Sequence, residues 1–129
     1  MSDTNLSGLK VVYVEDDPDI RAVAELSLGD VAKFDVRLCA SGKEALELFE
    51  EFKPDLVLLD VMMPGLDGPQ TLRALRKQEG MDSVPVIFMT ARLQPEEVDE
   101  YLRLGAIGVI PKPFDPMTLG DQIRAMISG

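Results

Sequence analysis

The chain has 129 residues, 46% of them hydrophobic and 28% charged, which is enough for one globular domain with its own core. Its 13 basic and 23 acidic residues give a net charge of -10, which argues against direct binding to nucleic acid. The lack of histidine excludes a catalytic triad and histidine metal ligands. The single cysteine, Cys39, excludes an intrachain disulfide and suits a reducing cytoplasm.

The sequence contains no run of about 18 apolar residues that could cross a membrane. Residues 1–8 form a polar lead-in without the basic and apolar regions of a signal peptide. We therefore expect one soluble, cytoplasmic domain over residues 1–129, with a core at about 9–128, no output domain and no membrane contact.

Five short apolar segments alternate with five amphipathic ones. Strands are predicted at 10–14, 34–38, 56–60, 84–89 and 107–110. Helices are predicted to begin at Asp17–Pro18, Ser41, Asp67–Pro69, Pro95 and Asp115–Pro116, with Gly29, Gly80 and Gly105 near the ends of the first, third and fourth. Strict alternation predicts an α/β fold, in which helices cover both faces of a five-stranded parallel sheet.

The stretch from Asp55 to Gly68 places a carboxylate at the end of its strand. The four apolar residues at 56–59 are typical of a strand covered on both faces, and Asp60 follows them. In open parallel sheets, ligands bind beyond the carboxyl ends of the strands, so Asp60 is expected to face a site. A lone aspartate at a strand end is more often only a turn cap, and the other strand ends must decide between these roles.

Polar and charged residues also follow three other predicted strands. They are Glu15, Asp16 and Asp17 after the first strand, Thr90 and Ala91 after the fourth, and Lys112 after the fifth. Each is weak alone, because acidic turns, strand-end threonines and surface lysines are common. At one edge of a sheet, the carboxylates form an all-oxygen site suited to Mg²⁺, while the hydroxyl and the ammonium suit phosphoryl oxygens.

These residues and their neighbours resemble the receiver domain of two-component response regulators. The matching motifs are Glu-Asp-Asp at 15–17, Leu-Leu-Asp-Val-Met-Met-Pro-Gly-Leu-Asp-Gly at 58–68, Met-Thr-Ala at 89–91 and Pro-Lys-Pro-Phe at 111–114. The resemblance covers residues 9–128 and implies a doubly wound, flavodoxin-like (βα)5 fold with strand order 2-1-3-4-5. Residues 105–119 look like those of stand-alone receivers and of receivers attached to hybrid kinases.

The resemblance also implies a role for each candidate residue. Asp60 would accept a phosphoryl group from a histidine kinase or a histidine phosphotransfer protein. The implied Mg²⁺ ligands are Asp60, Asp16, Glu15 directly or through water, and the backbone carbonyl of Met62. The implied ligands of the phosphoryl oxygens are Thr90, the N–H of Ala91, and Lys112, whose bond to Pro113 is a candidate cis peptide.

The same resemblance implies that the chain signals by binding a protein partner when phosphorylated, either as a monomer or as a phosphorylation-dependent dimer. The expected contact face consists of the fourth helix, the fifth strand and the fifth helix.

Two positions depart from the usual pattern of receivers. Glu15 stands where aspartate is usual, so the affinity for Mg²⁺ or its geometry is expected to differ modestly. Val109, three residues before Lys112, stands where tyrosine or phenylalanine is common. Val109 is either an ordinary strand residue or the mark of an altered switch, which would use loop 90–94 and the fourth helix. Met62 and Arg92 flank Asp60 and Thr90, where side chains often tune the attack of water on the phosphoryl group.

Two other functions compete with the hypothesis that Asp60 accepts a phosphoryl group. A Mg²⁺-dependent phosphatase with an aspartyl nucleophile usually has a second aspartate two residues later, whereas this chain has Met62. A degenerate receiver that binds partners constitutively is disfavoured because Asp16, Asp60, Thr90 and Lys112 are all present. The sequence therefore favours a signalling domain over an enzyme that acts on outside substrates.

Overall fold

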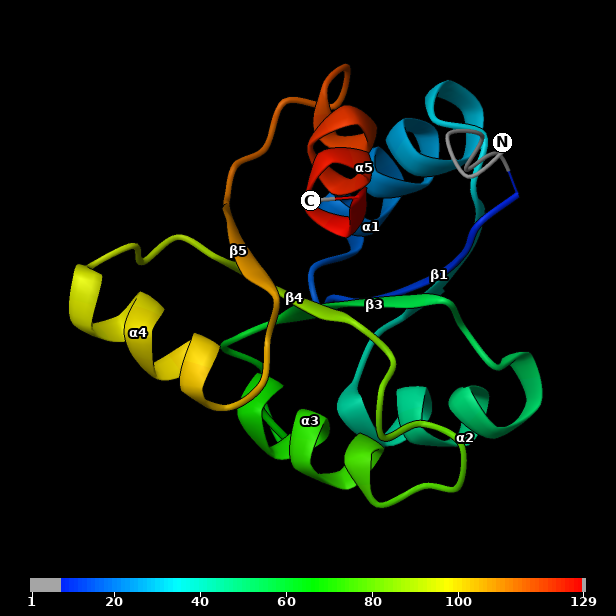
Figure 1. Ribbon diagram of the computed structural model, residues 1–129. Helices are drawn as coiled ribbons and strands as arrows, with labels where there is room; N and C mark the ends of the chain where they lie inside the picture. Colours follow the sequence, from blue (N-terminus) through cyan, green and yellow to red (C-terminus); the bar gives the residue numbers. More distant parts are fainter. Residues whose placement is uncertain (1–7, 129) are drawn as a thin grey trace.

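A five-stranded parallel sheet lies at the centre of the computed structural model, which describes residues 8–128 (Figure 1). Residues 1–7 of the predicted lead-in at 1–8 lie outside the described residues. The strands are β1(Lys10–Val14), β2(Asp35–Cys39), β3(Leu56–Asp60), β4(Val86–Thr90) and β5(Gly108–Pro111). The helices are α1(Pro18–Glu25), the π-helical turn η2(Leu26–Val31), α2(Gly42–Phe52), α3(Gly68–Arg76), α4(Pro95–Arg103) and α5(Leu119–Ser128).

The strand order is β2-β1-β3-β4-β5, and every neighbouring pair is parallel. This confirms the predicted sheet and its order. The register aligns the strand ends, because Val14 pairs with Leu59, Asp60 with Met89, and Thr90 with Pro111. The residues that follow β1, β3, β4 and β5 therefore leave the sheet along one edge.

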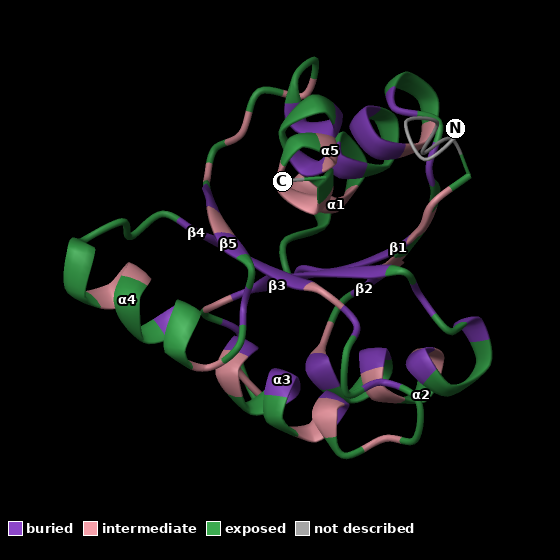
Figure 2. Cartoon of the chain, viewed as in Figure 1, coloured by how far each residue is buried: buried purple, intermediate pink, exposed green. Residues whose placement is uncertain are grey.

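Helices cover both faces of the sheet. The helices α1 and α5 lie over one face, and α2, α3 and α4 over the other (Figure 1). All five residues of β3 and all five of β4 are buried, as the purple strands in Figure 2 illustrate. Burial on both sides explains why the central strands are nearly continuous apolar runs. Within residues 8–128, no helix has the length and apolar character of a membrane span.

Aspartate caps begin the helices that follow β1 and β3. The Asp17 carboxylate accepts hydrogen bonds from the N–H groups of Asp19 and Ile20. The Asp67 carboxylate accepts from the N–H of Gln70, whose side chain accepts in return from the N–H of Asp67. Such caps each contribute about 1 kcal/mol and fix where the helix starts. They leave Asp60 and the acidic residues after β1 at the sheet edge.

A close approach between α3 and β3 fixes the turn beyond Asp60. A Cβ at Gly68 would lie 2.7 Å from the backbone oxygen of Asp60 and 3.1 Å from the Phe88 ring. Only glycine allows the first turn of α3 to pack this closely against the end of β3. The acidic strand end is thus held by backbone packing as well as by its own hydrogen bonds.

Several predicted boundaries are wrong by a few residues. The segment after Glu25 is a π-helical turn around Gly29, with the N–H of Ala32 bonded to the carbonyl of Ser27. The helix α3 ends at Arg76, before Gly80. The helix α5 begins at Leu119 and not at Asp115–Pro116, because Asp115 first caps a separate turn through the N–H of Met117.

Candidate functional site

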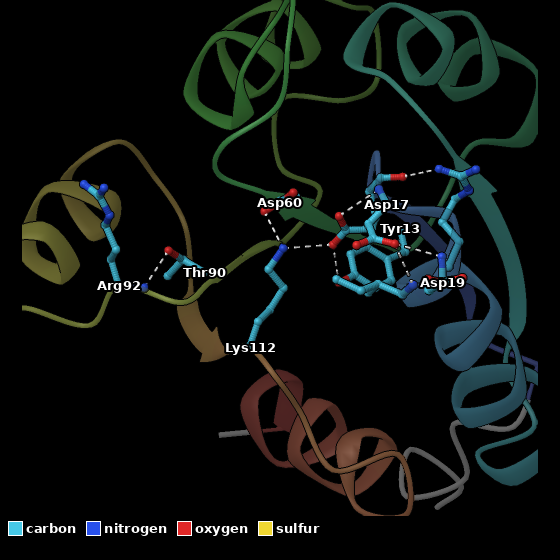
Figure 3. Close-up of polar contacts among 10 residues, drawn as sticks. Tyr13, Asp17, Asp19, Asp60, Thr90, Arg92 and Lys112 are labelled. Atoms are coloured by element: carbon cyan, nitrogen blue, oxygen red, sulfur yellow. Dashed lines mark hydrogen bonds and ion pairs between the residues drawn. The ribbon is translucent and has the colours of Figure 1, made fainter.

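Three charged side chains meet at the carboxyl edge of the sheet: Asp60 ends β3, while Glu15 and Lys112 directly follow β1 and β5. Figure 3 shows Lys112 pointing toward Asp60. The Lys112 Nζ donates a hydrogen bond of 2.9 Å to Asp60 Oδ1 and another of 3.0 Å to Glu15 Oε1. Glu15 and Asp60 are only 1% and 4% exposed. Lys112 is therefore the shared counter-charge of two buried carboxylates, in a chain region where the Lys112–Pro113 peptide bond is cis.

An acidic cluster of Glu15, Asp16 and Asp60 lies at this edge. One carboxylate oxygen from each residue lies within 4.8 Å of the other two. Glu15 and Asp60 are buried while Asp16 is exposed, so the cluster is open to solution on one side. Three carboxylates beside one ammonium leave an excess of negative charge on a set of hard oxygen donors. This donor set fits a hard divalent cation such as Mg²⁺.

The charge balance of the site shifts the pKa values of its members. Burial raises the pKa of Asp60 to about 6, because the hydrogen bond from Lys112 only partly offsets burial and the neighbouring Glu15. Burial alone would lower the pKa of Lys112, but its hydrogen bonds to Asp60 and Glu15 raise it. In the absence of a metal ion, the ionised form of Asp60 is thus less favourable than that of an aspartate in water, whereas the charged form of Lys112 is favoured.

The hydroxyl of Tyr13 is a further contact of this site, and the sequence analysis missed it. Tyr13 lies on β1 and donates to Glu15 Oε1 over 3.2 Å (Figure 3). The other carboxylate oxygen, Glu15 Oε2, accepts from the N–H of Asp17 over 3.2 Å. The signal in the sequence was the spacing of two, which places Tyr13 and Glu15 on the same face of a strand.

Thr90 and the loop after it lie beside the acidic cluster. The Thr90 side chain is buried, and its Oγ1 accepts a hydrogen bond of 3.0 Å from the N–H of Arg92 (Figure 3). Ala91 is exposed. The Thr90 hydroxyl therefore bonds a residue of its own loop, Arg92. Thr90 ends β4, which pairs with β3, the strand that carries Asp60.

An aromatic side chain from α4 reaches the region of Thr90. The Tyr101 ring packs against Phe88 of β4, with ring centroids 5.1 Å apart, and only 8% of Tyr101 is exposed. Burial and the charge of Glu97 raise the pKa of Tyr101, whereas the nearby Thr90 hydroxyl and Arg92 oppose this rise. Val109 packs against the same apolar cluster. The aromatic group near Thr90 thus comes from α4 and not from β5.

Hollows lie beside the site residues Met62 and Lys112. Met62 is 63% exposed and lines a cavity of about 430 Å³ in the loop after β3. An apolar hollow of about 570 Å³ lies between α1 and the loop after β5. Its lining residues are Asp19, Ile20, Val23, Ala91, Lys112, Pro113 and Phe114. The hollow beside α1 therefore reaches Lys112 and Ala91, whereas the one after β3 reaches Met62 and no residue of the acidic cluster.

Curated relatives share the sequence pattern of this chain. Response regulator Rre1 of Synechocystis sp. is 33% identical over 120 residues, which cover 93% of this chain and 52% of that protein. The probable transcriptional regulator ycf27 of Porphyridium aerugineum is 38% identical over 118 residues, which cover 92% of this chain and 48% of that protein. The chain thus spans about half the length of these relatives.

Solved structures match the fold over nearly the whole chain. Chemotaxis protein CheY4 of Vibrio cholerae superposes with a TM-score of 0.87 at 32% identity, covering 93% of this chain and 99% of that one. The Francisella response regulator 1452 receiver domain gives 0.81 at 31% identity, covering 92% and 96%. The family model described as response regulator receiver domain matches residues 11–124. On these matches and on the fold, the chain belongs to the receiver domain family of two-component response regulators.

Proposed function

We propose that this receiver domain takes a phosphoryl group onto Asp60 from the phosphohistidine of a histidine kinase or a histidine phosphotransfer protein. The observation that carries the proposal is the Lys112 ammonium, which bonds both Asp60 and Glu15 beside an open acidic cluster. In the transfer, an Asp60 carboxylate oxygen forms a bond to phosphorus, and the bond from phosphorus to the imidazole nitrogen breaks. The electron pair of that bond returns to the imidazole.

Receiver domains bind Mg²⁺ at an acidic pocket, and the donor set of this chain fits that ion. Glu15, Asp16, Asp60 and the backbone carbonyl of Met62 would hold it. When bound, the ion neutralises the crowded carboxylates and the incoming phosphoryl oxygens. Glu15 and Asp16 would bind and orient the ion, while Asp60 is the residue that forms the new bond to phosphorus.

Lys112 and Thr90 would hold the phosphoryl oxygens after transfer. Lys112 already bonds Asp60 Oδ1, so a phosphoryl group on that carboxyl lies within reach of the same ammonium. The Thr90 hydroxyl and the N–H of Ala91 would turn from their loop toward the remaining oxygens. Each phosphoryl oxygen then has a cation or a hydrogen-bond donor as partner.

The signal would leave the site through α4. Tyr101 packs on Phe88 of β4, near Thr90, so a rotation of Thr90 toward Asp60 would change the surroundings of the Tyr101 phenol. This arrangement offers a two-state element on α4 in place of the aromatic residue missing at Val109. A protein partner would then bind the face formed by α4, β5 and α5, to a monomer or to a phosphorylation-dependent dimer.

We propose that this receiver domain does not itself bind nucleic acid. Its net charge is -10, which opposes contact with phosphate backbones. Relatives named as transcriptional regulators are about twice as long as this chain, so any DNA contact of theirs can lie outside the matched part. We propose that the domain works in the cytoplasm, where kinases of this kind present their phosphohistidine.

Phosphatase action on outside substrates is the second candidate and is disfavoured. Position 62, where a general acid would stand, is an exposed methionine. The receiver family is a signalling family and not a class of conventional enzymes.

Incubation with acetyl phosphate and Mg²⁺ tests the acceptor directly. We expect the intact mass to rise by one phosphoryl group, and Asp60→Asn to abolish the gain because the nucleophile is removed. Asp55→Asn is the matched control, since Asp55 lies just before β3 and its carboxylate only accepts from the N–H of Lys10. No gain in the native chain, or an equal gain in Asp60→Asn, contradicts the proposal, and steady release of phosphate from monoesters favours the phosphatase.

The raised pKa of Asp60 predicts a specific pH dependence of stability in the absence of metal. The folded pKa is about 6, above the value of about 3.9 expected in the unfolded chain, so the folded state holds this proton more tightly. Stability from this group is therefore present below about pH 4 and is lost as the pH rises through about 6. In urea unfolding with a chelator, the native chain should lose about 2 kcal/mol relative to Asp60→Asn between pH 4 and pH 7. A difference between the two chains that is independent of pH contradicts this charge balance.

The role of Tyr101 is tested by hydrogen–deuterium exchange across α4, with and without the phosphoryl group. We expect Tyr101→Phe to accept the phosphoryl group normally but to lose at least half of the phosphorylation-dependent change in exchange at residues 95–103, because the hydroxyl that would respond to Thr90 is gone. Leu102→Ala, a change at an exposed position of the same helix, should keep the native response. A native-sized response in Tyr101→Phe would exclude this route.

A further inference from the structure

The Tyr13 side chain is a buried polar group in an otherwise apolar layer. Tyr13 is 0% exposed and packs in the cluster between the sheet and α1, η2 and α5. Its register partners on the two neighbouring strands are Leu38 and Leu58. Its hydroxyl donates to Glu15 Oε1 over 3.2 Å. Because a buried hydroxyl without a partner is costly, this bond ties the core packing of β1 to the carboxylate of Glu15.

Three donors hold the Glu15 carboxylate in place. Oε1 accepts from the Tyr13 hydroxyl and from Lys112 Nζ, and Oε2 accepts from the N–H of Asp17. Lys112 is shared with Asp60, so it is free to move when Asp60 changes. The Tyr13 hydroxyl is attached to a ring fixed in the core and cannot move far. Of the two side chains bonded to Oε1, Tyr13 is therefore the fixed one.

The length of the Glu15 side chain matches this contact. An aspartate at this position would end one methylene, about 1.5 Å, closer to the backbone. Its carboxylate would draw away from the Tyr13 hydroxyl, whose ring is held by β2 and β3 and cannot follow. Glutamate has one more rotatable bond than aspartate, so ordering its side chain on ion binding costs more entropy. A fixed donor that already holds the carboxylate reduces this cost. Tyr13 and Glu15 thus form a matched pair.

We infer that Tyr13 is a positioning residue for Mg²⁺ binding, which holds the Glu15 carboxylate in its binding orientation before the ion arrives. The inference rests on the proposed function, because it assumes that Glu15 belongs to the Mg²⁺ site. The hydroxyl is a fixed donor, because it reaches Glu15 Oε1 over 3.2 Å from a ring that is fully buried in the core.

A double-mutant cycle on Mg²⁺ binding tests the inference, with affinity measured by calorimetry on the unphosphorylated chain. Tyr13→Phe removes one hydroxyl and should weaken Mg²⁺ binding by about threefold to tenfold. In a Glu15→Asp background, where the hydroxyl no longer reaches the carboxylate, the same change should alter affinity by less than about twofold. Thr71→Val is the matched control, because it removes another fully buried hydroxyl, which donates to the backbone carbonyl of Asp67, and it should leave Mg²⁺ affinity unchanged.

Unfolding of the metal-free chains tests separately whether the Tyr13–Glu15 hydrogen bond forms in each background, whereas the Mg²⁺ affinity reports the positioning role itself. Tyr13→Phe should lower the urea midpoint of the native chain but raise that of Glu15→Asp, because the second variant already leaves the hydroxyl without a partner. If Tyr13→Phe alone does not fold, the comparison of Glu15→Asp with the double variant still carries the test.

The outcomes separate this inference from the proposed function. Native-like Mg²⁺ affinity in Tyr13→Phe, or the same loss in both backgrounds, overturns the positioning role while leaving the phosphoacceptor intact. A native chain that binds no Mg²⁺ overturns both.

Discussion

One ammonium group between two buried carboxylates is the interaction on which the site depends. Lys112 bonds Asp60 and Glu15 at 2.9 and 3.0 Å, and both carboxylates are almost completely removed from water. Buried like charges repel each other, and a single cation only partly relieves this repulsion. Burial, with a smaller contribution from the charge of Glu15, therefore raises the pKa of Asp60 despite the hydrogen bond from Lys112. An added positive charge would stabilise these crowded carboxylates. The site is therefore suited to a divalent ion and to the chemistry of a phosphoryl group.

The fold maintains this unfavourable charge arrangement through packing elsewhere. The buried β3 and β4 strands set the depth of Asp60 and Thr90, and the caps at Asp17 and Asp67 turn the chain into helices directly beyond the sheet edge. Gly68 lets α3 approach the backbone of Asp60 closely. Stability from the apolar layers thus offsets the cost of holding charges together, as is common at functional sites.

The layout of the fold could be predicted from the sequence because it rests on periodicity and on turn residues. Alternating apolar segments predicted the parallel sheet, and strand ends at 15–17, 60, 90 and 112 predicted which side chains share an edge. Helix boundaries were less predictable, because tertiary contacts decide them. The hydroxyl of Ser27 bonds the carbonyl of Pro116, which ties the π-helical turn to a loop 89 residues further along the chain. No local pattern encodes that contact.

The two tyrosines show why parts of the site were missed. Tyr13 follows the pattern of a core residue, and only the direction of its hydroxyl reveals its bond to Glu15. Tyr101 follows the pattern of an apolar helix face, and only the packing of α4 against β4 places it near Thr90. In both cases the informative group is the phenol hydroxyl of a tyrosine whose position in the sequence follows an apolar pattern. The departures at Glu15 and Val109 were visible in the sequence, but their partners required the structure.

The most direct test of the central claim is to locate the modified residue chemically. Borohydride reduces an acyl phosphate to an alcohol, so a phosphorylated aspartate becomes homoserine and can be found by peptide mass spectrometry. After treatment with a phosphodonor and Mg²⁺, we predict homoserine at position 60 and at no other aspartate. Homoserine at Asp16 or Asp17, or none at position 60, would contradict the assignment of Asp60 as the acceptor.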